Sequence, residues 1–543
     1  MSTLSFSRLA PLAGLVLLLT GEFLLFDQLG ARHHTWVYPR WNDQVQYLTE
    51  SYLAYEHARA EGLLSALRLT LVNPSAQGTL HDTFALLVFS LAGPSRSAAL
   101  SLNMLAFLGW QLAAFLWIRR STSSTSAAFT GILLLLTLAG GWQPMPGGAF
   151  DFRLDWLATC AMGASLAACM ATDRFSRTLP STLFGLAVGL TLLTRFLTGS
   201  YLLPIYLVLA VSCSLSPGRW PRLGNLLLSG LVALLVAGPV FWINRQIIHT
   251  YYIYGHFTGP ERTFRPPGMD LLPGLEWMWH RILHQQVGTP FIWVAAATLL
   301  AAVAAALFWP RRSDEREFNR IPETPWLLPP LAFALVPVVI LTLHPQKTPQ
   351  VLGIVLPGVA CLVIIPTVRA LATGRARVRW GITASVAVVS LALFLVRMAR
   401  DPHPPGFRAE VQRVAFAADL IVAESKRAGL ISPRVAVDRI TDSLDAQVLR
   451  VLCYERHRHW YPLIMTLPTG IAPEDPALIW ERFEHSDFVF LTREGGVQHF
   501  PFDRQLSGMR PEIWQWAEAT LTPLADLPLS DSHMVLFQRI PAP

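Results

Sequence analysis

The residues whose types and spacing could do chemistry begin at Arg40, in a polar stretch that follows the first apolar segment. If this stretch is helical, Asp43, Tyr47 and Glu50 share one face, because side chains three and four positions apart are neighbours on a helix. A carboxylate there could accept a proton from a substrate hydroxyl. The alternative is an amphipathic surface helix with solvated acids, which is the interpretation we favour for Glu50, Glu56 and Glu61. For Asp43, which lies between two aromatic residues at the expected membrane interface, both interpretations stay open.

A second group of charged residues surrounds the start of the fourth apolar segment. Proline and glycine residues in 141–148 predict a turn, and Asp151 and Asp155 then follow four positions apart. The unpaired amides and the dipole of a helix N-terminus stabilise carboxylates. This accounts for one of the two acids. It does not explain why both acids and Arg153 cluster where a membrane face should be apolar.

Two further groups are basic. His344 and Lys347 lie in a short loop between apolar segments. They could bind an anionic phosphate, with the lysine acting as a point charge, or they could snorkel to lipid headgroups. Arg195 lies inside the long apolar stretch 179–214, where an arginine at bilayer depth is costly. We therefore expect that stretch to break near Arg195 into two tight antiparallel helices.

The composition indicates the class of protein that carries these residues. Of 543 residues, 52% are hydrophobic and only 15% are charged, whereas a soluble domain has about 25% charged residues. The formal net charge is +7, but much of the lysine and arginine falls in short loops, which is typical of membrane topology and argues against nucleic acid. The five cysteines have no metal-ligand spacing and indicate no disulfide framework. The chain is therefore expected to be a polytopic α-helical membrane protein.

We expect about eleven transmembrane helices, with an uncleaved first helix preferred over a signal peptide. Basic residues cluster on one side if the helices alternate, so that side and the N-terminus are predicted to be cytoplasmic. Residues 82–92 are too short to span and are expected to lie in the interface. The expected spans are 9–29, 97–118, 125–141, 156–171, 179–193, 197–214, 225–243, 289–309, 326–343, 351–368 and 380–397.

The composition changes near Pro402, where helix-like stretches begin to alternate with short β-rich runs. This pattern predicts a small α/β domain outside the membrane. We therefore divide the chain into a transmembrane domain, 1–400, whose outer loop 30–96 carries juxtamembrane helices, and an extracytoplasmic domain, 401–543. The expected helices are 408–428, 442–455, 476–484 and 511–519, and the expected strands are 434–437, 488–491 and 534–537.

Over residues 9–370 the order and spacing of these motifs resemble the GT-C glycosyltransferases, in particular lipid A aminoarabinose transferases and protein O-mannosyltransferases. Asp43-Gln44-Val45-Gln46-Tyr47 is similar to the D-(E)-x-x-Y motif of the first outer loop, with Gln44 replacing the second acid. Residues 84–95 look like the juxtamembrane helix before the second span. His81-Asp82 stands where the family often has paired prolines. Three further matches are Asp155-Trp156-Leu157-Ala158, Thr194-Arg195 within 185–204, and His344 with Lys347 before Leu356-Pro357.

The resemblance implies an inverting sugar transfer from a polyprenyl-phosphate donor at the outer membrane face. Asp43 would be the general base, and Asp155 or Asp151 would orient the acceptor, the sugar or a basic partner. The leaving phosphate would be neutralised by positive groups such as Lys347, His344 and Arg195. Arg40, Tyr47 and Arg153 are further substrate-binding candidates. No cofactor is implied, and a divalent metal stays open as an alternative.

The implied partners are a polyprenyl-phosphate-linked sugar, an acceptor that is a lipid, a glycan or a protein, and membrane lipids. The short loops favour a bacterial inner membrane, and the sequence identifies neither the sugar nor the acceptor. A transporter or flippase of lipid-linked sugars is the first alternative, although no internal repeat typical of transporters is found. A structural protein that works through the outer domain is the second, but a single helix would be enough to anchor it.

Overall fold

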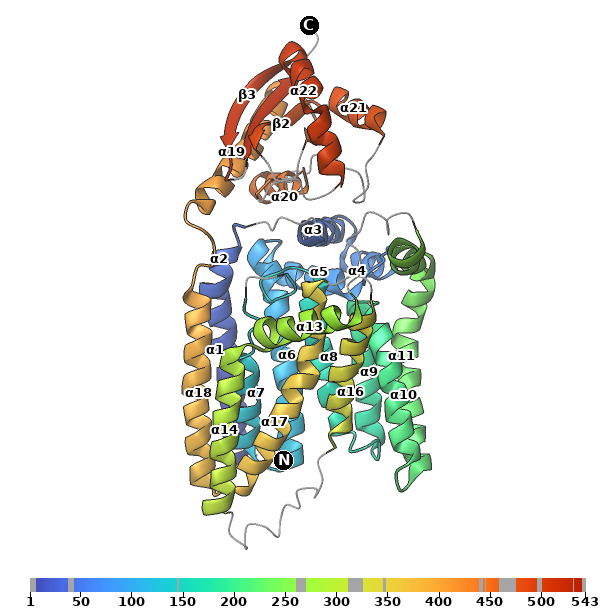
Figure 1. The fold of residues 1–543 in the computed structure, drawn as a ribbon, viewed down its shortest axis with the longest axis vertical. Coiled ribbons are helices and arrows are strands. Elements are labelled where there is room, and N and C mark those ends of the chain that lie inside the picture. The colour runs from blue at the N-terminus through green and yellow to red at the C-terminus, as the bar shows by residue number, and fades with distance from the viewer. Residues whose placement is uncertain are drawn as a thin grey trace.

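A bundle of long apolar helices forms the body of the molecule, and a small sheet with its own helices lies beyond one end of that bundle (Figure 1). This arrangement is seen in a computed structural model. The structure describes residues 6–37, 43–143, 146–259, 270–310, 326–344, 348–438, 443–444, 446–458, 475–495, 501–530 and 532–539.

Each of the eleven predicted spans overlaps a helix of the bundle. Seven helices among the described residues are long and apolar enough to cross a membrane, which confirms a polytopic membrane protein. Length and composition alone do not establish eleven spans, because α7, α9, α10 and α16 are shorter. The bundle helices are α1 (Phe6–Leu25), continued by η1 (Phe26–Ala31) and α2 (Arg32–His34), α6 (Arg96–Thr122), α7 (Thr125–Leu136), α8 (Leu154–Ala171), α9 (Thr178–Thr194), α10 (Thr198–Ser214), α11 (Arg219–Ile248), α14 (Thr289–Phe308), α16 (Leu328–Leu343), α17 (Leu356–Thr373) and α18 (Ala376–Ala399).

The predicted break at Arg195 is present. Helix α9 ends at Thr194 and α10 begins at Thr198, so the arginine lies at a helix end. The segment before α5 docks on this break through two backbone hydrogen bonds, from Thr79 N to Leu193 O (3.0 Å) and from Phe196 N to Gln77 O (2.7 Å). A Cβ atom on the intervening Gly78 would lie 2.3 Å from the carbonyl oxygen of Thr194. Only glycine permits this approach, which brings Gln77 close to the Arg195 break.

A layer of shorter helices lies across the end of the bundle that faces the sheet (Figure 1). The helix predicted at 82–92 is present as α5. Helix α3 starts with polar residues. One of its faces is buried and carries apolar side chains such as Val45, Leu48 and Tyr52. The layer contains α3 (Asp43–Glu61), α4 (Leu63–Val72), α5 (Leu80–Ala92), η2 (His249–Thr258), α13 (Leu271–Arg281), η3 (Ile282–Val287) and η4 (Pro349–Val355).

The four strands form one sheet in the order β1-β2-β4-β3, with β1 and β2 parallel and the other pairs antiparallel. All three predicted strands are present. The edge strand β3 was not predicted, because Pro523 and Pro528 within it are unfavourable in a central strand. Helix α22 starts ten residues before the predicted start, because Pro511 lies inside the helix and not at its first turn. The elements are α19 (Phe407–Arg427), β1 (Val435–Val437), α20 (Ala446–His457), α21 (Pro476–Glu484), β2 (Phe488–Gly495), α22 (Pro501–Thr520), β3 (Leu521–Pro528) and β4 (Ser532–Arg539).

Helix α20 contacts α3 through two tyrosine–glutamate pairs. The hydroxyl of Tyr52 on α3 donates a hydrogen bond to Glu455 on α20 (2.6 Å). The hydroxyl of Tyr454 on α20 donates to Glu56 on α3. The two tyrosine rings lie with their centroids 5.1 Å apart. The reciprocal pairs hold the helix that begins with Asp43 against the sheet-containing part of the chain.

Candidate active site

Asp43 is the first residue of α3, and its side chain is 51% exposed. One of its carboxylate oxygens lies 3.6 Å from the guanidinium of Arg153. This separation is too long for a direct hydrogen bond, so the arginine provides a nearby positive charge without occupying the carboxylate. Asp43 therefore combines electrostatic support with access for a substrate. Arg40, the other predicted residue of this stretch, lies outside the described residues.

Behind Asp43 lies a buried network centred on Asp151. Its carboxylate accepts hydrogen bonds from the Gln44 side chain (2.6 Å) and from the backbone N–H of Gly147 (2.7 Å). The Arg153 guanidinium lies 3.2 Å from the same carboxylate. Gln44 in turn accepts a hydrogen bond from Arg96. The network balances two acids with two arginines, which explains why charged residues cluster at this end of the helices.

The network changes the structural role expected for Asp151. We expected Asp151 and Asp155 to open the fourth apolar helix together. Helix α8 instead begins at Leu154, with Arg153 in the N-cap position. Only Asp155 lies in the first turn of α8, whereas Asp151 belongs to the preceding loop and binds Gly147 there.

A second ion pair joins Asp155 to Arg195, and the Arg195 guanidinium donates a hydrogen bond to the Asp155 carboxylate. The Arg195 side chain is 14% exposed. Its buried Nε atom makes no hydrogen bond among the described residues, and neither does the buried hydroxyl of Tyr201. Buried donors of this kind are normally paired. These two groups could therefore bind an anionic or hydroxyl-bearing part of a substrate.

Tyr47 lies close to a charged residue of each group, Asp43 and Arg195. Its hydroxyl donates a hydrogen bond to the Gln77 side chain, which in turn donates one to the hydroxyl of Tyr251 (3.0 Å). Burial raises the pKa of Tyr47 well above its usual value, and the negative charge of Asp43 adds to this effect while Arg195 opposes it. The phenol therefore stays protonated and acts as a hydrogen-bond donor.

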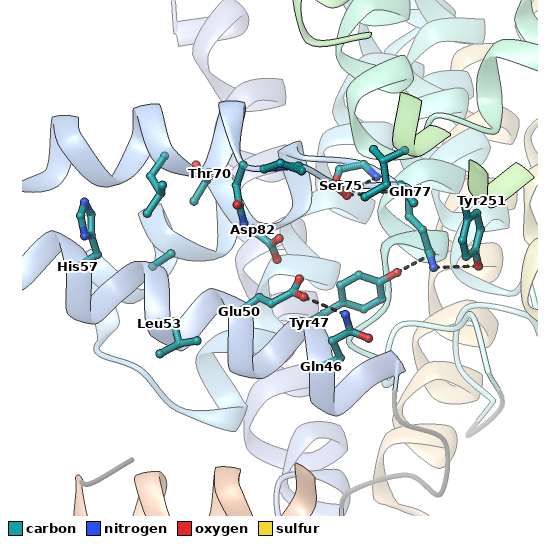
Figure 2. A pocket seen from close by; sticks show the side chains of 17 residues that line it. Gln46, Tyr47, Glu50, Leu53, His57, Thr70, Ser75, Gln77, Asp82 and Tyr251 are labelled. Atoms are coloured by element: carbon teal, nitrogen blue, oxygen red, sulfur yellow. Dashed lines mark hydrogen bonds between the residues drawn. The ribbon is translucent and has the colours of Figure 1, made fainter. Parts of the chain in front are cut away.

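A cavity of about 510 Å³ opens beside Tyr47, and Gln46, Glu50, Gln77 and Asp82 are among the residues that line it. In Figure 2 the side chains of Glu50 and Asp82 point toward one another across this space. Burial, and then the charge of Asp82, raise the pKa of Glu50 to about 7, although a hydrogen bond from Gln46 (2.9 Å) opposes the shift. We expected Glu50 to be a solvated surface acid, but the structure places it in a cavity wall.

The predicted basic loop is only partly described. His344 is the residue that follows α16, and its ring lies 5.3 Å from the ring of Phe257. Lys347 lies outside the described residues. No group of three or more His, Cys, Asp or Glu side chains that could hold a metal occurs in the part of the chain that was searched, which is limited to the described residues.

The structure brings Asp43, Asp151 and Arg153 together and places the Asp155–Arg195 pair near Tyr47. Sequence analysis did not select Gln44, Arg96 or Gln77 as site residues. Gln44 was noted only as a departure from the family motif, because its burial against Asp151 appears only in the folded structure. Arg96 could have been found as an arginine at the start of an apolar span.

Two crystal structures share the fold of this chain. One is ArnT from Cupriavidus metallidurans in the apo state, with a TM-score of 0.61 and 16% sequence identity, covering 97% of this chain and 98% of ArnT. The other is ArnT from the same organism bound to undecaprenyl phosphate, with a TM-score of 0.60 and 15% identity over the same shares of the two chains. No protein-family description and no curated protein sequence matches the chain. ArnT is a GT-C enzyme, so the expected GT-C-like fold is confirmed.

Proposed function

We propose that this protein is a membrane glycosyltransferase that moves a sugar from a polyprenyl-phosphate donor to an acceptor hydroxyl, with Asp43 as the general base. The observation that carries the proposal is the half-exposed carboxylate of Asp43 beside Arg153, at the end of a GT-C-like bundle. The likeness to an ArnT structure that contains undecaprenyl phosphate supports a polyprenyl-phosphate lipid as the donor carrier.

In the proposed reaction Asp43 accepts the proton of the acceptor hydroxyl while the hydroxyl oxygen attacks the anomeric carbon of the sugar. The bond between that carbon and the phosphate oxygen breaks, and the polyprenyl phosphate leaves with the electron pair. Attack from the face opposite the leaving phosphate inverts the configuration. Arg153 supports this role because its positive charge, 3.6 Å away, favours the ionised carboxylate of Asp43. It makes no direct hydrogen bond, so the carboxylate oxygens can still accept the proton.

The leaving phosphate needs positive groups that are already in place before the bond breaks. Arg195 is suited to this task, because Asp155 holds one side of its guanidinium while its Nε atom makes no hydrogen bond among the described residues. Tyr47 could donate a hydrogen bond to the sugar or to the phosphate. Arg40, His344 and Lys347 stay candidates for binding the donor.

The remaining parts of the proposal concern topology. The eleven bundle helices would all span a bacterial inner membrane, with the N-terminus in the cytoplasm and Asp43 at the outer face. Residues 1–400 would form the transferase domain and residues 401–543 a periplasmic domain. The transferred sugar is a hexosyl or pentosyl group, and the acceptor is a lipid, a glycan or a protein.

The test is sugar transfer by the purified full-length protein from polyprenyl-phosphate donors, with wild type compared to Asp43→Asn. We expect the variant to bind the donor lipid but to lose at least 100-fold in turnover, because removal of a general base costs about 10²–10⁴ in rate. Asp526→Asn, a change at a carboxylate that is 59% exposed in the sheet region, is the matched control.

Equal transfer by wild type and Asp43→Asn would refute the assignment of the base. Absence of transfer from every donor, combined with lipid flipping by both proteins, would support the transporter alternative instead.

A further inference from the structure

A second cavity, of about 310 Å³, lies at the opposite end of the helix bundle from Asp43. Helix α8 connects the two ends, with Asp155 near its start and Met170 in the wall of this second cavity. The two residues are fifteen positions apart, which corresponds to about 23 Å along the helix axis, or most of the roughly 30 Å of a bilayer core. The second cavity is therefore separate from the candidate active site.

Three arginines from three different elements converge on this cavity. Arg174 belongs to the turn between α8 and α9, Arg222 to the first turns of α11, and Arg369 to the last turns of α17. Among the described residues of the lining, the exposed Asp173 is the one acid beside these three arginines. The other lining residues are Trp117, Ser121, Met170, Trp326, Ile365 and Val368.

The turn that carries Arg174 has an unusual backbone conformation. Asp173, Arg174 and Phe175 have φ angles of 55°, 56° and 60°, in the left-handed region that side chains other than glycine rarely adopt. Two contacts from α11 hold the turn in place, from Arg222 Nη1 to the Arg174 carbonyl (3.2 Å) and from Asn225 to the Phe175 carbonyl (2.8 Å). The wall is therefore built by packing and is not a loose loop.

Membrane topology alone does not account for this arrangement. A positive-inside signal requires basic residues near the ends of spans, but it does not require them to share a cavity. Arg119, Arg120 and Arg177 lie at the same end of the bundle and are not part of the cavity lining. Arg369 lies four residues before the end of the candidate span Pro349–Thr373, and it also lines the cavity.

We propose that this cavity binds the phosphate headgroup of an anionic lipid. The arginines would bind the phosphate through charge-assisted hydrogen bonds. Trp117, Met170 and Ile365 provide the apolar wall that a lipid glycerol and the first part of an acyl chain require. Basic pockets between transmembrane helices at the cytoplasmic side recognise lipid phosphates for the same physical reasons. This site goes beyond the proposed sugar transfer and does not depend on it.

The test measures lipid binding to the full-length protein in detergent, by native mass spectrometry and by thermal unfolding. The probes are phosphatidylglycerol, phosphatidylcholine and inorganic phosphate. We expect one bound phosphatidylglycerol with at least tenfold higher affinity than phosphatidylcholine. The variant Arg174→Gln/Arg222→Gln/Arg369→Gln should lose this preference, whereas the control Arg119→Gln/Arg120→Gln/Arg177→Gln should keep it.

A single change, Arg369→Met, provides a second readout if the triple variant does not fold, because methionine suits the apolar surroundings. It should weaken phosphatidylglycerol binding at least fivefold. Unchanged preference in a folded triple variant, or in Arg369→Met, would overturn the proposal. Equal binding of phosphatidylcholine would also overturn it. Stabilisation by inorganic phosphate at the same concentrations, with no added effect of the lipid, would identify a free-anion site instead.

Discussion

The carboxylate of Asp43 lies 3.6 Å from the guanidinium of Arg153, and that guanidinium also lies 3.2 Å from the buried Asp151. One arginine thus serves two acids of different exposure. Asp151 has its oxygens occupied by Gln44 and Gly147, whereas Asp43 faces solvent and is accessible to a substrate. Burial and hydrogen bonding thus distinguish Asp151 from the exposed Asp43.

Replacing Arg153 should destabilise the protein. In Arg153→Gln the buried Asp151 carboxylate loses its countercharge, and breaking a buried ion pair in this way costs about 3–5 kcal/mol. The unfolding temperature in detergent should fall, and the double variant Asp151→Asn/Arg153→Gln should recover part of the loss. Arg177→Gln, at a half-exposed arginine, is the control and should change stability by less than about 0.5 kcal/mol. An unchanged unfolding temperature in Arg153→Gln would show that the network does not depend on this charge.

Glu50 should make stability depend on pH. Its pKa is about 7 in the folded protein and close to 4.5 when the chain is unfolded, so between these values the folded state binds the extra proton. Stability from this group is therefore greatest below pH 4.5 and falls as the pH rises towards 7. The unfolding temperatures of wild type and Glu50→Gln, measured from pH 5 to 8, should converge at low pH and differ most at high pH, with the variant more stable. Parallel curves would contradict the assignment.

Arg195 should contribute to turnover more than to donor binding. If it stabilises the charge that develops on the leaving phosphate, Arg195→Gln should lower kcat by about 10²–10³ with a smaller change in KM. Arg195→Lys should recover part of the activity, because it keeps the charge. The control is Arg245→Gln, at an exposed arginine that packs on Trp242. An increase of the same size in KM, with kcat unchanged, would instead assign Arg195 to binding of the donor in the ground state.

The contact between α3 and α20 should contribute measurable stability. Tyr52→Phe removes a hydrogen bond to Glu455 and should cost about 1 kcal/mol. A double-mutant cycle with Glu455→Gln isolates the energy of this pair. Tyr55→Phe on the same helix is the matched control. Additive effects of the two changes would show that the pair contributes no coupling energy.

The helices could be predicted because their signals are local. Apolar runs, charged turns and the cost of Arg195 at bilayer depth all lie within short stretches, and the α9–α10 break is found where it was expected. Strand β3 was missed for the opposite reason. Its two prolines are tolerated only because it lies at an edge of the sheet, and edge position is a property of the assembled sheet.

The site could be predicted in its residue types but not in its pairing. Asp43, Asp151 and Arg153 were recognisable as charged residues in predicted loops. Nothing local shows that Gln44 reaches Asp151, because 107 residues separate them along the chain. The cavity that raises the pKa of Glu50 is also formed by packing between separate helices, so no helical periodicity could reveal it.

The Asp155–Arg195 pair has a consequence for the synthesis of the chain. The two residues are 40 positions apart, and the acid is made first. When the α9–α10 hairpin is inserted, the countercharge of its arginine is already present at the start of α8. An arginine that enters a bilayer beside a waiting carboxylate has a smaller electrostatic cost than one that enters alone. We therefore expect the order of these two residues along the chain to favour insertion of the α9–α10 hairpin.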